Sequence, residues 1–174
     1  MRLTNKILAG AALAVSMTGV ASAADLLTPV DPIYSSPLFD FEGLYVGASA
    51  GGAIAGGGPY GTLGVIIGSN FAITDGIIAG VEFQGTGYFT GGGLTSYDAL
   101  ALGRVGGFLS DNTMIYGELG AGVADSTMVY ALGGGVEMAM TDQLAVRGEI
   151  QGLGAWGSSP SIGKATVGLI WHID

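Results

Sequence analysis

The chain has 174 residues, with 14 acidic side chains against 5 lysines and arginines, and it has no cysteine. A net charge of −9 excludes a nucleic-acid-binding protein, because such proteins need a cluster of basic side chains. The lack of cysteine excludes a disulfide framework, a zinc–thiolate site and a cysteine nucleophile.

The N-terminus has the pattern of a secretory signal peptide, residues 1–23. Two basic residues, Arg2 and Lys6, precede an uncharged apolar stretch that ends at Val20, and small residues follow as far as Ala23. We therefore expect export, with cleavage after Ala23. A retained membrane anchor is the less favoured alternative, because a helix that spans a bilayer needs about 20 apolar residues.

Residues 24–42 differ in composition from the rest of the exported chain. Their prolines and acidic residues are Pro29, Pro32, Pro37, Asp25, Asp31, Asp40 and Glu42. Frequent proline and scattered acids predict an extended, solvated periplasmic leader rather than an arm that binds a partner.

From Leu44 onward the apolar residues recur with a period of two, which predicts strands. The expected strands are 44–53, 62–70, 77–88, 97–108, 113–123, 128–140, 144–154 and 164–173. Their lengths match the 9–11 residues of a tilted strand that crosses a membrane. No apolar run after residue 23 reaches the 18 residues that would indicate a membrane helix.

The last expected strand illustrates the alternation. One face carries Ala165, Val167, Leu169, Trp171 and Ile173, and the other carries Lys164, Thr166, Gly168, Ile170 and His172. Apolar side chains facing lipid and polar or small ones facing inward are typical of a membrane barrel. We therefore predict an all-β fold, an eight-stranded antiparallel transmembrane β-barrel over residues 43–174. Leu100, Leu102 and Ile66 interrupt the pattern, because they share the expected inward face.

The connections predict the orientation of this barrel. Three of them contain an aspartate in a short turn, at Asp75, Asp111 and Asp142. Small outer-membrane barrels have tight periplasmic turns, so we expect these three turns and both chain ends on the periplasmic side. The glycine-rich connections 51–61 and 87–94 are expected to be mobile outer loops, without the lysine of a phosphate-binding loop.

The expected inward face carries a set of charged residues. They are Glu82, Arg104, Glu118, Glu137, Arg147 and Glu149, with Lys164 as a further candidate, and Tyr45 and Tyr116 could join them or lie in an interfacial aromatic girdle. Charges in an interior of low dielectric should pair across strands. Such a network could gate an ion path or act as a structural plug. The narrow lumen of eight strands favours the plug.

Enzymatic function is not expected. The single histidine, His172, lies at the periplasmic end of the last strand, where we expect it to be solvated together with Asp174. Acyl transfer on outer-leaflet lipid would need its catalytic group at the opposite rim. We see no cluster of metal ligands in the sequence pattern and predict no cofactor.

Three segments resemble the opacity-protein-like, porin-family barrels of outer membranes. They are FEGLYVGASAG at 41–51, GGGVEMAMTDQLAVRGEI at 133–150 and TVGLIWHI at 166–173. The resemblance implies an OmpA/OmpX-like meander in the outer membrane of a Gram-negative bacterium, surrounded by its lipid. It also implies insertion by the barrel-assembly machinery after transport by periplasmic chaperones.

The closing strand carries the expected assembly signal at Trp171 and Ile173. Ile173 stands where the family has a C-terminal aromatic residue, and Met138 replaces another of its aromatic residues. The predicted function is a structural role at the cell surface, as a surface antigen whose interior is closed by charge pairs. The alternatives are a small porin-like pore for small solutes and a soluble secreted β-barrel that binds an apolar ligand.

Overall fold

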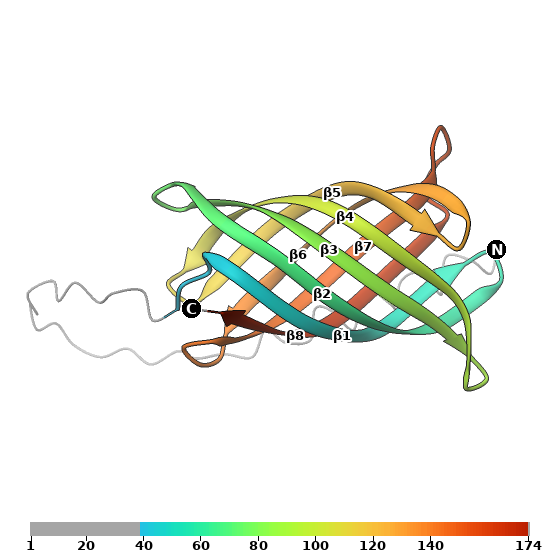
Figure 1. Ribbon diagram of the computed structural model, residues 1–174, viewed down its shortest axis with the longest axis horizontal. Coiled ribbons are helices and arrows are strands. Elements are labelled where there is room, and N and C mark those ends of the chain that lie inside the picture. The colour runs from blue at the N-terminus through green and yellow to red at the C-terminus, as the bar shows by residue number, and fades with distance from the viewer. Residues whose placement is uncertain (1–38, 174) are drawn as a thin grey trace, which may run out of the picture. The chain divides into compact units, whose positions relative to one another are not determined.

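The computed structural model describes residues 39–173, which fold into strands that pair in chain order (Figure 1). The strands are β1 (Gly43–Ala55), β2 (Gly58–Thr74), β3 (Ile77–Thr90), β4 (Gly93–Ser110), β5 (Thr113–Ala124), β6 (Thr127–Ala139), β7 (Leu144–Ala155) and β8 (Ile162–Ile173). Within this described part of the chain, no helix is long and apolar enough to cross a membrane.

Closure of the sheet comes from the pairing of β8 with β1. This antiparallel register runs from Leu44 opposite Ile173 to Ile54 opposite Gly163. Every other strand pairs with its neighbours in sequence, so the sheet is a closed up-and-down barrel. Closure satisfies the backbone hydrogen bonds of every strand, which a sheet needs in order to sit in lipid. The predicted eight-stranded antiparallel barrel is confirmed.

The two faces of the barrel are occupied as the period-two pattern predicts. In β3 the side chains of Val81 and Phe83 point outward and are 54% and 59% exposed, whereas Glu82 between them is fully buried. The same alternation along all strands covers the outside with large apolar side chains. A soluble barrel would have the opposite arrangement, with its apolar side chains inside.

Short turns join the strands at both ends of the barrel. The three aspartate turns, at 75–76, 111–112 and 140–143, lie together at one end (Figure 1). At the other end only 156–161 is longer than two residues. The expectation of mobile glycine-rich loops at 51–61 and 87–94 is wrong. Strands occupy most of both segments, because β2 already begins at Gly58 and β4 at Gly93. Gly91 and Gly92, with φ angles of 60° and 87°, form a two-residue turn that needs positive φ at both positions.

Two strands are much longer than predicted. β2 has 17 residues where 62–70 was expected, and β4 has 18 residues where 97–108 was expected. The added residues are 58–61 and 71–74 in β2 and 93–96 and 109–110 in β4, which mix glycine, proline, threonine and serine with apolar residues and give no clear apolar alternation. They are strands because their backbones continue the ladders with the neighbouring strands.

Residues 39–42, which belong to the leader predicted to be solvated, are partly buried in the structure. Phe39 and Phe41 are buried at the end of the barrel that carries the aspartate turns, and Asn70 Nδ2 donates a 2.8 Å hydrogen bond to the Phe41 carbonyl oxygen. The expectation of a solvated segment is wrong here, because two apolar rings outweigh the surrounding acids. The signal peptide and residues 24–38 lie outside the described residues.

The interior contains an apolar layer near each end. One layer holds Phe39, Phe41, Ile66, Ile78, Met114, Ala145 and Ile170 together with two tyrosines, and the other holds Leu100, Leu102, Val129, Ala131 and Leu153. Leu100, Leu102 and Ile66, which interrupt the polar pattern in the sequence, are therefore inward-facing members of these layers. The charged residues of the sequence prediction lie between the two.

Candidate functional site

Two arginines and two glutamates form the centre of the interior. Arg147 Nη1 lies 2.7 Å from Glu82 Oε2, and its Nη2 lies 2.8 Å from Glu137 Oε2. Arg104 reaches the same two oxygens from the opposite side, at 3.1 Å and 3.4 Å. All four side chains are buried. Each carboxylate oxygen is thus shared by two guanidinium groups, which offsets part of the cost of removing these charges from water.

Two tyrosines extend this ion-pair group. Tyr45 Oη donates a 2.5 Å hydrogen bond to Glu82 Oε2 and accepts one of 2.9 Å from Arg104 Nη1. Tyr116 Oη donates to Glu149 Oε2 at 2.7 Å, and the Arg104 guanidinium carbon lies 3.9 Å from the centre of its ring. Both tyrosines therefore point inward, and neither belongs to an interfacial girdle.

Glycines on neighbouring strands make room for these two rings. A Cβ on Gly68 would collide with the ring and hydroxyl of Tyr45, which lies opposite it across β1 and β2. A Cβ on Gly135 would collide with the ring and hydroxyl of Tyr116 across β5 and β6. Part of the high glycine content is thus explained by large polar side chains that fill a narrow lumen.

A second group of polar side chains lies beside the arginines. Gln84 Nε2 donates to Glu82 Oε1 at 2.8 Å and to Glu149 Oε1 at 3.0 Å. Gln151 Nε2 donates to Gln84 Oε1 at 3.0 Å and to Glu118 Oε1 at 2.6 Å. The structure thus brings all six predicted charged residues into one buried group. Both glutamines share the inward parity of their charged neighbours, which is the signal that identifies them in the sequence.

His172 is placed differently from the prediction. The imidazole is 2% exposed, and its Nε2 lies 3.0 Å from Glu137 Oε1. The ring centres of Phe39 and Tyr45 lie 4.8 Å and 5.4 Å from the imidazole centre. The expectation of a solvated histidine is wrong, because its parity in β8 turns it inward and the segment before β1 covers it. Asp174 lies outside the described residues.

Lys164 does not join the six residues. Its Nζ lies 3.5 Å from Asp98 Oδ2 and donates to Thr86 Oγ1 at 3.1 Å, and Tyr88 Oη donates to the same aspartate oxygen at 2.5 Å. Asp98 is not among the charged residues predicted from the sequence. Its parity with Arg104 on the same strand would have placed it inside.

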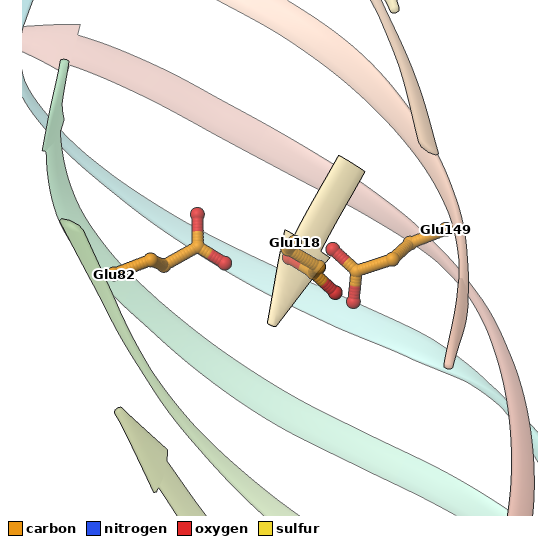
Figure 2. A group of neighbouring side chains, drawn as sticks. All are labelled: Glu82, Glu118 and Glu149. Atoms are coloured by element: carbon orange, nitrogen blue, oxygen red, sulfur yellow. The ribbon is translucent and has the colours of Figure 1, made fainter. Parts of the chain in front are cut away.

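Three of the carboxylates meet across the lumen. Glu82 on β3, Glu118 on β5 and Glu149 on β7 each offer one oxygen, and these oxygens lie within 4.8 Å of one another (Figure 2). The sequence pattern did not reveal this group of carboxylates, because the three residues are far apart in the sequence and come together only in the closed barrel.

The predicted assembly signal lies on the outer face of β8. Trp171 and Ile173 point outward and are about half exposed. Their role in assembly stays a prediction.

The closed ring of eight strands, apolar outside and polar inside, defines the class of small transmembrane β-barrels. A scan of protein-family models and a search of curated protein sequences find no match for this chain. Solved structures do match, and three of them each cover 75% of this chain.

One match is a de novo designed transmembrane β-barrel, with 18% identity, a TM-score of 0.52 and 94% of that chain covered. A second is the Neisserial surface protein A, with 12% identity, a TM-score of 0.54 and 96% covered. A third is Ail, the attachment invasion locus protein of Yersinia pestis, with 13% identity, a TM-score of 0.52 and 97% covered. At these identities the likeness concerns the fold, and it confirms the small outer-membrane barrel architecture.

Proposed function

We propose that this chain is exported to the outer membrane of a Gram-negative bacterium and serves there as a closed structural barrel at the cell surface. The observation that carries the proposal is the filled interior. A buried group of ion pairs lies between two apolar layers, and aromatic rings from the segment before β1 cover one end.

The size of the lumen supports closure. Eight strands enclose roughly the volume that inward-facing side chains fill, whereas water-filled porins have 16–18 strands. Here the middle of the barrel is filled by two arginine side chains with the tyrosine rings beside them. An open pathway would have to break several ion pairs at once. A structural role, rather than solute passage, is the function that this arrangement supports best.

The outer face supports the proposed location. Large apolar side chains are exposed on every strand, for example Val65, Phe83 and Val167. In water such a surface would drive aggregation, whereas lipid acyl chains cover it at no cost. The signal peptide predicted at 1–23 would supply export. The barrel-assembly machinery, with periplasmic chaperones, would supply insertion, with Trp171 and Ile173 at the end that it reads.

Planar-bilayer recording tests the closed interior. Pure wild-type protein should give no steady conductance. The double variant Glu137→Ala, Arg147→Ala removes a charge pair from the centre and should conduct. The matched control, Met138→Ala with Val146→Ala, changes the next paired positions on the outer face and should stay silent. Steady ohmic conductance from the wild type would overturn the proposal and favour a small pore.

Cell fractionation tests the location. The protein should be in the outer-membrane fraction, and it should migrate differently on a gel before and after boiling, as closed barrels do. A soluble periplasmic pool of folded protein would contradict membrane insertion and support a soluble ligand-binding barrel. A purely structural role also predicts that incubation with outer-membrane lipids leaves those lipids chemically unchanged.

A further inference from the structure

The buried charges do not balance. Four carboxylates, from Glu82, Glu118, Glu137 and Glu149, share the central group with only two guanidinium groups. Lys164 forms its ion pair with Asp98, apart from the central group. Counted over these carboxylate and guanidinium groups alone, the centre of the lumen carries two negative charges more than positive ones. An uncompensated charge in a buried site is strongly destabilising.

The excess negative charge lies on Glu118 and Glu149. Both arginines make their close contacts with Glu82 and Glu137. Glu149 comes only within 3.9 Å of Arg147, and Glu118 has no ion pair within the described part of the chain. Arg104 lies opposite Glu118 in the strand register, yet its guanidinium turns away across the lumen. The carboxylate of Glu118 is thus left without a cation.

A second observation points to a ligand at this place. Glu118 Oε2 and Gln151 Oε1 have no hydrogen-bond partner among the residues that the structure describes. The two residues are only 6% and 5% exposed. They are in direct contact, since Gln151 Nε2 donates to the other oxygen of Glu118. Two side chains in contact thus each keep one buried acceptor oxygen without a donor, and buried acceptors of this kind almost always have a partner.

The geometry around these oxygens suits a cation. Figure 2 shows the carboxyl groups of Glu82, Glu118 and Glu149 pointing toward one another from three strands. For three atoms no more than 4.8 Å apart, there is always a point within about 2.8 Å of all three, a few tenths of an ångström beyond a calcium–oxygen bond. Small side-chain movements would close that difference, and the Gln84 amide, whose nitrogen donates to Glu82 and Glu149 in this structure, would turn its oxygen toward the ion.

We propose that Glu82, Glu118 and Glu149 hold one divalent cation that prefers oxygen ligands, with calcium as the probe. The ligand set contains neither cysteine nor histidine, which disfavours zinc. Carboxylates at flexible spacing, together with a glutamine oxygen, suit calcium better than the strict octahedron of magnesium. A charge of +2 balances the two excess negative charges. The ion would join β3, β5 and β7 across the lumen, whether or not the barrel conducts.

Terbium luminescence tests binding directly. Tyr116 donates a hydrogen bond to Glu149, so a terbium ion held by these carboxylates would be excited through that ring. Barrel refolded in detergent with terbium should show tyrosine-sensitised emission that saturates at one ion per barrel and is displaced by calcium. Glu118→Gln and Glu149→Gln should each weaken binding about ten-fold or more, because ligand charge sets affinity. Glu42→Gln, at an exposed carboxylate, is the matched control and should bind like the wild type.

Thermal unfolding supplies the second measurement. Refolding with calcium at 100-fold above its Kd should raise the unfolding temperature of the wild type by about 5–10 °C over an EDTA-treated sample. Glu118→Gln should lose this response and, without calcium, should be more stable than the wild type. Absent terbium emission, or equal emission from Glu118→Gln, overturns the proposal. Stabilisation by acid with no calcium response also overturns it, because a shared proton would then balance the charge.

Discussion

Replacement of Arg147 by methionine should destabilise the barrel more than any other single change in the central group. Its guanidinium lies 2.7 Å from Glu82 and 2.8 Å from Glu137, whereas Arg104 reaches the same carboxylates at 3.1 Å and 3.4 Å. Methionine keeps much of the apolar volume but leaves both carboxylates with the weaker partner alone. Removing one partner of a buried ion pair costs about 3–5 kcal/mol, and we expect a loss in this range.

The assay is equilibrium urea unfolding in lipid vesicles, followed by the fluorescence of Trp171, which faces lipid on β8. The double variant Arg147→Met, Glu137→Gln removes a carboxylate together with its partner, so it should recover about 1–3 kcal/mol relative to the sum of the two single changes. Asp111→Asn, at an exposed turn, is the control and should stay within about 0.5 kcal/mol of the wild type. A loss below about 1 kcal/mol for Arg147→Met, or strict additivity in the double variant, would refute the reasoning.

The remaining predictions concern the outer face, the glycines and the covered end, and the same unfolding measurement checks each of them. Val167→Arg, at an outward position that is 62% exposed, should cost about 2–4 kcal/mol, whereas Ile173→Arg near the rim should cost about 1 kcal/mol or less. Equal costs at the two depths would contradict the lipid-facing assignment. Gly68→Ala should cost about 1–3 kcal/mol, because the new Cβ meets a tyrosine ring; Gly148→Ala, where a Cβ has open space, should be neutral or slightly stabilising. Phe41→Ala should cost about 3–5 kcal/mol, and a negligible effect would show that the end of the barrel is closed without it.

The central group also shows how the register and the ion pairs of a narrow barrel can differ. Glu137 lies opposite Arg147 in the register, and these two residues form an ion pair. Arg104 lies opposite Glu118, and these two do not. A long side chain in an eight-stranded barrel reaches strands on the far side as easily as its neighbours. The ion pairs of this lumen therefore do not follow from the strand register alone.

The sequence by itself determined the strands and their two faces. The parity of Arg147, Glu149 and Gln151 along β7, for instance, is a local property, because successive side chains of a strand point to opposite faces. The same parity identified all six charged residues, whereas it left Tyr45 and Tyr116 open between the lumen and an interfacial girdle. The three aspartate turns were likewise readable from short segments.

The tertiary structure alone decided which of these residues meet. The burial of His172, the separation of Lys164 from the six and the meeting of Glu82, Glu118 and Glu149 depend on the shear of the closed sheet and on residues 39–42 covering its end. The ends of β2 and β4 were also decided this way, since backbone pairing extends both strands through residues that show no clear apolar alternation. The physical reason is the same in each case. A strand's alternation is fixed by its own backbone, whereas contacts across the lumen depend on the relative heights of strands far apart in the chain.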